Sequence, residues 1–441
     1  MCDLEKLVIR GGKPLIGEIE ISGAKNAAVA ILPATLLAKG EFIIDNLPNI
    51  SDIDATLDIL RHLGAEITRL GKHTVRINTM GVTNKPIPEF LACKLRASYY
   101  FLGALLGRFG SARVAMPGGC NFGGVRPIDL HIKGFNALGA TVGTDGEYVV
   151  AQTTASTLMG NTVFLDKPSV GATINVMLAA VGAKGITVIE NAAKEPHIVD
   201  IANFLNRMGA EVRCAGTDAI TIIGGLPMKG CEHTIIPDQI ETGTYMTLAA
   251  ATRGQLTLKN ITSPHLDKIT AKLRECGATV IPEEVDSSEQ ITVSATGRLK
   301  CCDIKAEAHP GFPTDMQPQF TALLSICEGT SMVTDSVWDN RFKYTDQLTK
   351  MGAQIKVSGN TACIQGTNEL TGASVFANDL RAGAALIIAA LAAKGTTTIG
   401  NISYIDRGYE DIVEKLSAVG ADIQRVEFPD VPPVSNIQKV E

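Results

Sequence analysis

Apolar positions along the chain follow a helical period in two kinds of segment, and both kinds end at a glycine. The first kind ends in Gly-Ala and runs into a β-type stretch, as in LRHLGAEIT at residue 60; its glycines are at 64, 139, 209, 277, 352 and 420. The second kind is an Ala/Leu-rich run followed by a β-branched strand, with glycines at 40, 110, 185, 254, 329 and 395. Each pattern predicts a helix, a glycine cap and a strand.

The two series repeat together. Both step by 66 to 75 residues, which predicts six α/β units with two helices each. The period leaves their grouping open, because one closed ring, two groups of three and three pairs all fit it. An ordinary pair of doubly wound domains would make six evenly spaced matches a coincidence, so we favour the repeat.

Composition places the chain among globular proteins. Its 441 residues are 45% hydrophobic and 20% charged, and the net charge of −6 is spread without blocks. No basic surface for nucleic acid or an anionic membrane is visible. The first residues, MCDLEKLVIRGG, do not resemble a signal peptide, and the longest apolar runs, such as 384–393, are shorter than the roughly 18 residues of a membrane span. We expect a soluble cytoplasmic protein.

The metal-binding residue types are scattered. Ten cysteines include no CxxC pair, and the seven histidines occur singly, without HxxxH or HExxH spacing. We therefore expect reduced thiols and no metal site. No GxxxxGK[ST] loop or GxGxxG dinucleotide fingerprint occurs either, so we expect no ATP hydrolysis and no cofactor.

One cysteine has unusual surroundings. Cys120 lies in MPGGCNFGGVRPIDLH, among four glycines and a proline, with Arg126 six residues later. Such composition is typical of a surface loop, whereas most free cysteines are small buried residues. An arginine can tune a nearby thiol and can bind phosphate bidentately. We favour a reactive thiol at Cys120.

Several charged residues stand at junctions between repeat elements. Lys25 and Asn26 open an Ala-rich helix, where free N–H groups attract anions, although such residues are most often merely solvated. Asp315 is either a helix cap or a general base. If the units are pseudo-symmetric, the cations would surround one centre and bind a highly charged anion; they are Lys25, Arg96, Arg126, Arg381 and Arg407.

Ten short motifs together resemble one family over about residues 6–424. They are SGAKNA (22–27), LRAS (95–98), PGGC (117–120), RPIDLH (126–131), DKPSVGAT (166–173), ENAAKEPHIVD (190–200), PDQIETGT (237–244), PTDMQ (313–317), DLRA (379–382) and IDRGYE (405–410). The family is UDP-N-acetylglucosamine 1-carboxyvinyltransferase. The related shikimate-pathway transferase lacks the PGGC loop.

The resemblance implies a fold and a division of the chain. The fold would be a two-domain inside-out α/β barrel with six pseudo-symmetric βαβαββ units, three in each domain. Residues 25–236 would form the N-terminal domain with the cysteine loop, and residues 1–24 with 237–441 the C-terminal domain, into which the N-terminal strand crosses. The domains would close on the ligands.

The resemblance also implies a reaction. The sugar 3′-hydroxyl of UDP-N-acetylglucosamine would add to C2 of phosphoenolpyruvate while C3 is protonated, and phosphate would then leave, in the first committed step of peptidoglycan synthesis. Cys120 would supply the proton and be the target of fosfomycin, and Asp315 would be the base. Neither nucleic acid nor membrane would be a partner, and the oligomeric state stays open.

The resemblance further implies substrate-binding roles for the residues that match the family's motifs. Lys25, Arg126 and Arg407 would hold phosphoenolpyruvate with Arg381 nearby, Asn26 would contact the sugar, and Arg96 would position the sugar nucleotide. The uridine diphosphate site would be lined by Pro127, Asp129, Leu130, Lys167, Ser169, Val170 and Gly171. Glu195 and Asp238 match positions near the hinge and cleft.

One departure keeps alternatives open. Five residues, NFGGV, separate Cys120 from Arg126, one more than in the family pattern. A catalytically silent paralogue that binds the sugar nucleotide therefore remains an alternative, beside the shikimate transferase with its different acceptor.

Overall fold

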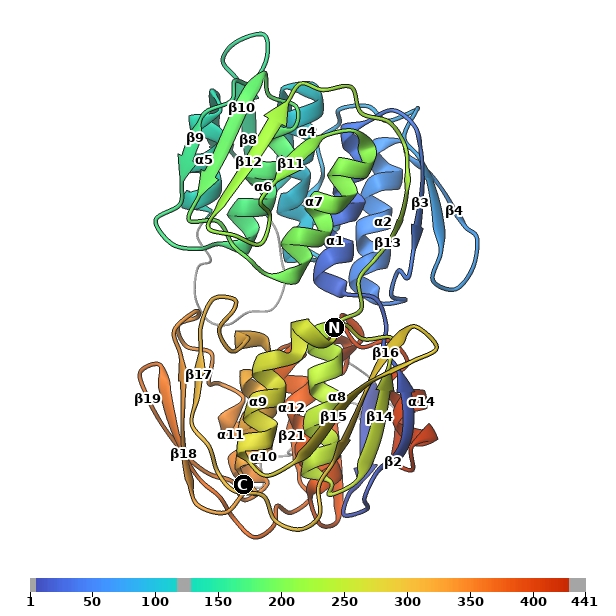
Figure 1. Ribbon diagram of the computed structural model, residues 1–441, viewed down its shortest axis with the longest axis vertical. Helices are drawn as coiled ribbons and strands as arrows, with labels where there is room; N and C mark the ends of the chain where they lie inside the picture. The colour runs from blue at the N-terminus through green and yellow to red at the C-terminus, as the bar shows by residue number, and fades with distance from the viewer. Residues whose placement is uncertain (1–4, 117–127, 428–441) are drawn as a thin grey trace, which may run out of the picture.

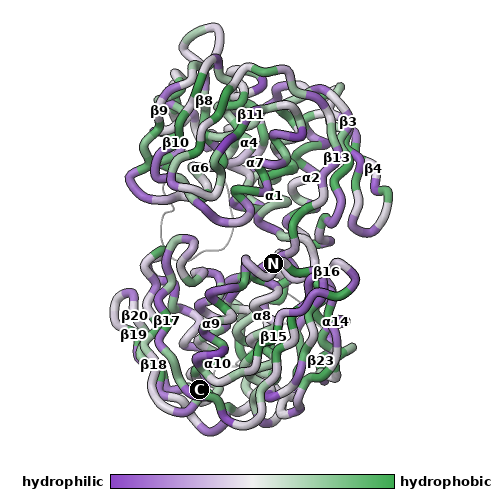
Figure 2. Tube along the Cα trace, in the orientation of Figure 1, coloured by the Kyte–Doolittle hydropathy of each residue, from purple (hydrophilic) through white to green (hydrophobic). Residues whose placement is uncertain are grey.

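The computed structural model describes residues 5–116 and 128–427 (Figure 1). Over these residues the chain folds into two α/β halves. One hydrophobic core contains residues between 24 and 235, and a second combines residues 7–21 with 240–423. Figure 2 shows apolar stretches in the interior of each half, for example around α1 (Lys25–Ala34) and α4 (Tyr100–Phe109). Within the described ranges, no helix has the length and apolar character needed to cross a membrane.

Each half has three sheets, and so the six units form two groups of three. Those of the first half are, in strand order, β13 (Glu232–Thr234), β3 (Glu41–Asp45), β5 (Val75–Asn78) and β4 (Glu66–Arg69); β6 (Ser111–Ala115), β8 (Tyr148–Thr153) and β7 (Ala140–Asp145); and β11 (Glu211–Arg213), β12 (Ala219–Gly224), β10 (Gly185–Glu190) and β9 (Thr162–Phe164). Those of the second half are β15 (Thr279–Val285), β16 (Ser288–Ser294), β14 (Gln255–Lys259) and β2 (Ile16–Glu20); β17 (Ile304–Ala306), β18 (Thr330–Asp335), β20 (Thr361–Gln365) and β19 (Gln354–Ser358); and β21 (Ser374–Phe376), β22 (Thr396–Gly400), β1 (Glu5–Arg10) and β23 (Asp422–Glu427).

The four-stranded sheets share one pairing pattern, in which one edge strand is parallel to its neighbour and the other pairs are antiparallel. Three strands that fill this pattern come from distant parts of the chain. β13 supplies the parallel edge beside β3, β2 supplies the parallel edge beside β14, and β1 lies between β22 and β23. The N-terminal segment therefore completes two sheets of the second half.

Among the described residues, each sheet has two helices, and each half has one further short helix. Besides α1 and α4, those of the first half are α2 (Ser51–Leu63), the short α3 (Glu89–Ala92), α5 (Asp129–Ala137), α6 (Val170–Ala180) and α7 (Pro196–Met208). Those of the second half are α8 (Gln239–Ala251), α9 (Asp267–Glu275), α10 (Gln317–Leu324), α11 (Thr345–Lys350), α12 (Leu380–Ala392), the short α13 (Ser403–Asp406) and α14 (Ile412–Ala418). Helices α8, α10 and α12 pack against one another, and every residue of α10 is buried. A helix that is buried all round belongs inside its domain, which leaves the sheets outside.

The glycine caps explain most of the repeat. All six glycines of the Gly-Ala series have positive φ, between 85° and 107°, which favours glycine. In the second series the expected cap is confirmed only at Gly110, because α6, α10 and α12 end at Val181, Ser325 and Ala393, before the glycines at 185, 329 and 395. The expected cap is also wrong at Gly40 and Gly254, and neither of these two has positive φ. A Cβ on Gly254 would lie 2.0 Å from the carbonyl oxygen of Leu15, and one on Gly40 would lie 2.7 Å from the nitrogen of Gly230. Because these two glycines have no side chain, the backbone segments that lead to β2 and β13 can pack directly against them.

The chain crosses between the halves twice, and the two crossings lie side by side. The nitrogen of Ala24 donates to the carbonyl oxygen of Ile236 (2.7 Å), and that of Asp238 donates to the carbonyl oxygen of Ser22 (2.9 Å). The carboxylate of Asp238 then caps α8 and also accepts from the nitrogen of Lys25 (3.0 Å). This bond places the start of α1 beside the start of α8.

Candidate active site

A buried carboxylate joins the two halves near these crossings. Asp52, in the first turn of α2, is 4% exposed. It accepts from Lys25 Nζ at 2.7 Å, and from Arg407 Nε at 2.9 Å across the seam. Lys25 begins α1, and Arg407 directly follows α13. Two cations predicted from the sequence therefore meet at one aspartate that the sequence analysis did not single out.

The charges at this centre hold one another ionised. Burial alone would raise the pKa of Asp52, but the neighbouring Lys25 and Arg407 outweigh burial and lower the pKa below its ordinary value. Asp52 is therefore an anion at neutral pH. An anionic ligand that reached Lys25 and Arg407 would have to share them with this carboxylate.

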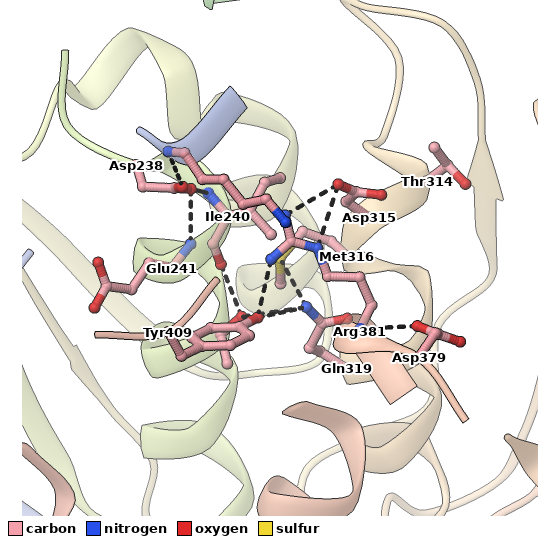
Figure 3. A network of polar contacts seen from close by, with 12 residues as sticks. Asp238, Ile240, Glu241, Thr314, Asp315, Met316, Gln319, Asp379, Arg381 and Tyr409 are labelled. Carbon is pink, nitrogen blue, oxygen red and sulfur yellow. Dashed lines mark hydrogen bonds and ion pairs between the residues drawn. The ribbon is translucent and has the colours of Figure 1, made fainter. Parts of the chain in front are cut away.

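A second carboxylate, partly buried, lies in the second half (Figure 3). Asp315, in the 3₁₀ turn Thr314–Met316 before α10, does not cap that helix. Its Oδ1 accepts from Arg341 Nη2 at 2.7 Å, and its Oδ2 accepts from Arg381 Nη2 at 3.1 Å. Arg381 comes from the first turn of α12, and both arginines are 4% exposed. Asp315 is thus clamped between two guanidinium groups.

The two arginines determine the acidity of Asp315. Burial raises its pKa, but Arg381 and Arg341 together lower the pKa far below the usual range of an aspartate. In this arrangement Asp315 is a weak base. A ligand that took Arg381 away from Asp315 would raise the pKa and make the carboxylate a better proton acceptor.

The two centres are neighbours. A Cβ on Gly408 would lie 3.3 Å from Lys25 Cδ and 2.6 Å from Leu380 Cδ2, and Leu380 directly precedes Arg381. Gly408 therefore separates the Lys25 side chain from the start of α12. The next residues contact the other half again, because Glu410 accepts from His73 Nε2 at 2.7 Å and from the nitrogen of Asn49 at 3.1 Å.

The residues expected at a uridine diphosphate site gather at two helix starts. Asp129 and Leu130 open α5, and Ser169 caps α6 by accepting from the nitrogen of Ala172 at 3.3 Å. The two helices approach each other closely at Gly171, since a Cβ there would lie 2.9 Å from Nε2 of His131, the third residue of α5. Val170 lies between Ser169 and Gly171, and Lys167 is exposed just before them. Adjacent helix starts are suited to bind phosphate groups.

Other expected residues are less connected. Arg96 opens the 3₁₀ turn Arg96–Tyr99, and burial lowers its pKa and that of nearby His131, the latter to about 4. Asn26 is half-buried in the first turn of α1. Glu195 precedes α7, and its Oε2 is buried without a hydrogen-bond partner among the described residues. Cys120, Arg126 and Pro127 lie outside the described residues.

Several residues of these centres carry no signal in the sequence. Asp52 looks like any acidic residue at a helix start, and Arg341 lies in WDNRFKY, which carries no motif. The neighbours Asp406 and Arg407 do not pair as a local ion pair would, because Asp406 binds Arg425 and Arg407 binds Asp52. No local signal in the sequence distinguishes these long-range partners.

Comparison with known proteins identifies the family. The family model described as EPSP synthase (3-phosphoshikimate 1-carboxyvinyltransferase) matches residues 9–416. A UDP-N-acetylglucosamine 1-carboxyvinyltransferase 3 from Caldanaerobacter subterraneus subsp. tengcongensis is 53% identical over 423 residues, covering 96% of this chain and 100% of the relative. The chain belongs to the UDP-N-acetylglucosamine 1-carboxyvinyltransferase family. A second relative with that name, from Clostridium botulinum, is 52% identical over 424 residues, 96% of this chain and 100% of its own.

Solved structures agree with this family. The enolpyruvyl transferase NikO from Streptomyces tendae superposes with a TM-score of 0.85 at 26% identity, covering 96% of this chain and 99% of its own. EPSP synthase from Acinetobacter baumannii, with a TM-score of 0.73 at 19% identity over 96% of this chain and 99% of its own, shares the fold. The expected two-domain α/β fold is confirmed. Because the chain belongs to the UDP-N-acetylglucosamine 1-carboxyvinyltransferase family, it is a transferase.

Proposed function

We propose that this chain transfers the enolpyruvyl group of phosphoenolpyruvate to the 3′-hydroxyl of UDP-N-acetylglucosamine and releases phosphate, as the first committed step of peptidoglycan synthesis. The observation that carries the proposal is a pair of carboxylates near the seam, Asp52 buried and Asp315 partly buried, each of which binds two cations. Such a site offers both a base and a set of cations for a small, highly charged anion. The relatives at 52–53% identity carry the name of this reaction.

The chemistry assigned to the residues is an addition followed by an elimination. Asp315 would take the proton of the sugar hydroxyl as its oxygen bonds to C2 of phosphoenolpyruvate, and Cys120 would give a proton to C3. Loss of a proton from C3 and of phosphate from C2 would then restore the double bond. Lys25, Arg407 and Arg126 would hold the phosphoenolpyruvate anion and stabilise the departing phosphate.

The ion pairs of Asp315 with Arg381 and Arg341 suggest an order of events for this scheme. Because Asp315 is a weak base while Arg381 and Arg341 hold it, its basicity would rise when phosphoenolpyruvate engages Arg381. The base would thus become effective only with the second substrate in place. This dependence would protect the sugar nucleotide from unproductive proton transfer.

The sugar nucleotide would lie along the starts of α5 and α6. Ser169, Val170, Gly171, Asp129 and Leu130 sit together there, with Lys167 exposed beside them, and the helix-start N–H groups would bind the diphosphate. Pro127 would line the same site, Asn26 would contact the sugar, and Arg96 would position the nucleotide. Glu195 and Asp238 would lie near the hinge and the cleft.

The division into domains at residues 25–236 and 1–24 with 237–441 completes the proposal. The side-by-side crossings near residues 23 and 237 would be its hinge, and closure would exclude water from the substrates. The enzyme would act in the cytoplasm, where both substrates are small soluble molecules.

Mass spectrometry of the acceptor tests the proposal. Incubation of the purified protein with phosphoenolpyruvate and UDP-N-acetylglucosamine should increase the mass of the sugar nucleotide by one enolpyruvyl group. Cys120→Ser and Asp315→Asn should slow this conversion. A folded protein that binds the sugar nucleotide but leaves it unmodified would instead be a silent paralogue.

A further inference from the structure

Tyr409 has a buried hydroxyl at the centre of the polar network below Asp315 (Figure 3). The residue is 2% exposed and lies two positions after Arg407. Its hydroxyl lies 2.9 Å from Thr244 Oγ1, 3.3 Å from Arg381 Nη1 and 3.4 Å from Gln319 Nε2. The residue belongs to the segment that carries a proposed ligand of phosphoenolpyruvate, and it contacts a second one.

The direction of these bonds follows from counting protons. The hydroxyl of Thr244 donates to the carbonyl oxygen of Ile240 at 2.7 Å, so it has no second proton for Tyr409. Tyr409 must therefore donate its proton to Thr244. Its oxygen is then free to accept from Arg381, whose guanidinium can only donate.

Arg381 is consequently held from two sides. Its Nε and Nη2 donate to Asp315, and its Nη1 donates to Tyr409. The guanidinium carbon also lies 5.7 Å from the centre of the Tyr409 ring, within the range of a cation–π contact. Of the side-chain hydrogen bonds that Arg381 donates among the described residues, only the one to Tyr409 does not depend on Asp315.

We infer that Tyr409 is a positioning residue, whose hydroxyl keeps the Arg381 guanidinium in place when Arg381 exchanges Asp315 for the phosphoenolpyruvate anion. This inference rests on the proposed function. Tyr409 touches neither substrate in this scheme and acts through Arg381. Its backbone is itself fixed, because the nitrogens of Gly408 and Tyr409 both donate to the carbonyl oxygen of Ile405 at 3.1 Å. The segment that carries Arg407 thereby also sets the orientation of Arg381.

Tyr409→Phe tests the inference, with Tyr344→Phe as the matched control. Tyr344 is also buried, and its hydroxyl hydrogen-bonds to Gln317 and Thr321, and to no arginine in the part of the chain that the structure describes. Tyr409→Phe should raise the KM for phosphoenolpyruvate roughly tenfold, the order expected for one lost hydrogen bond to a charged group, and leave the KM for UDP-N-acetylglucosamine unchanged. Tyr344→Phe should leave both unchanged. Equal effects of the two variants, or a parallel rise of both KM values in Tyr409→Phe, would overturn the inference.

Two further measurements keep the outcome decisive. If the wild-type protein does not turn over, the proposed function fails. Calorimetry of inorganic phosphate binding then tests Tyr409 separately. The inference requires that Tyr409→Phe bind inorganic phosphate roughly tenfold more weakly than the wild type. If Tyr409→Phe does not fold, Thr244→Val removes the acceptor that orients the hydroxyl. This variant should also weaken phosphoenolpyruvate or phosphate binding, and wild-type affinity would refute the role of Tyr409.

Discussion

Replacing Asp52 with asparagine should destabilise the protein and at the same time strengthen anion binding. Asparagine keeps the shape of the side chain but removes the charge that neutralises Lys25 and Arg407. The Asp52 side chain is 6% exposed, and those of Lys25 and Arg407 are 12% and 15% exposed. Removing one partner of a buried ion pair costs about 3–5 kcal/mol, and the residual exposure of the cations favours the lower end, about 3 kcal/mol.

The gain in anion affinity has the same origin. Phosphate or phosphoenolpyruvate would no longer share Lys25 and Arg407 with a carboxylate, and relief of this competition should lower the Kd for phosphate about tenfold, or about 1.4 kcal/mol. Bound anion should accordingly restore part of the lost stability, because a ligand that binds only the folded state stabilises it.

Urea unfolding followed by circular dichroism, with and without phosphate, measures both effects. Asp54→Asn is the control, because Asp54 lies on the same helix turn, is 59% exposed and pairs with Arg69 at the surface. It should cost about 1 kcal/mol or less. The reasoning would be refuted if Asp52→Asn were no less stable than Asp54→Asn, or if it bound phosphate more weakly than the wild type.

Three other predictions concern the same centres. Asp315→Asn should lower kcat at least about a hundredfold, as loss of a general base does, with little change in the KM for the sugar nucleotide; unchanged turnover would exclude it as the base. Gly408→Ala should raise the KM for phosphoenolpyruvate, because the added Cβ would lie 3.3 Å from Lys25 Cδ; steady-state kinetics should find no effect of Gly143→Ala, where a Cβ meets nothing within 4 Å. Because the folded-state pKa values of Asp52 and Asp315 are lowered, their stabilising contribution is complete above the unfolded value near pH 4 and is lost as pH falls below it. Acid titrations of stability should show this loss in the wild type and a smaller loss in Asp52→Asn, and equal losses would contradict it.

The repeat could be predicted from the sequence because its signals are local. A helix that ends at a left-handed glycine repeats its pattern in every unit, as at Gly64 and Gly209. The grouping into two sets of three was not predictable from the period, since β1, β2 and β13 complete sheets far from their own sequence neighbours. The tight packing at Gly40 and Gly254 was not predictable for the same reason, because the backbone that approaches each of them is distant in sequence.

The site was predictable only in part, for a similar reason. Lys25, Arg381 and Arg407 stand at helix ends within recognisable motifs. Asp52, Arg341 and the hydroxyl of Tyr409 acquire their role from contacts outside their own motifs, over 355 positions between Asp52 and Arg407 and 26 between Asp315 and Arg341. Charge pairing of this kind has no period and no local spacing.

Phosphate release from phosphoenolpyruvate, measured with UDP-N-acetylglucosamine and with shikimate 3-phosphate as acceptors, tests the central claim most directly. Release that depends on the sugar nucleotide, with none from shikimate 3-phosphate, is the predicted result. Release with shikimate 3-phosphate alone would assign the other acceptor of this fold. No release with either acceptor, from folded protein that still binds the sugar nucleotide, would contradict the proposed enzymatic function.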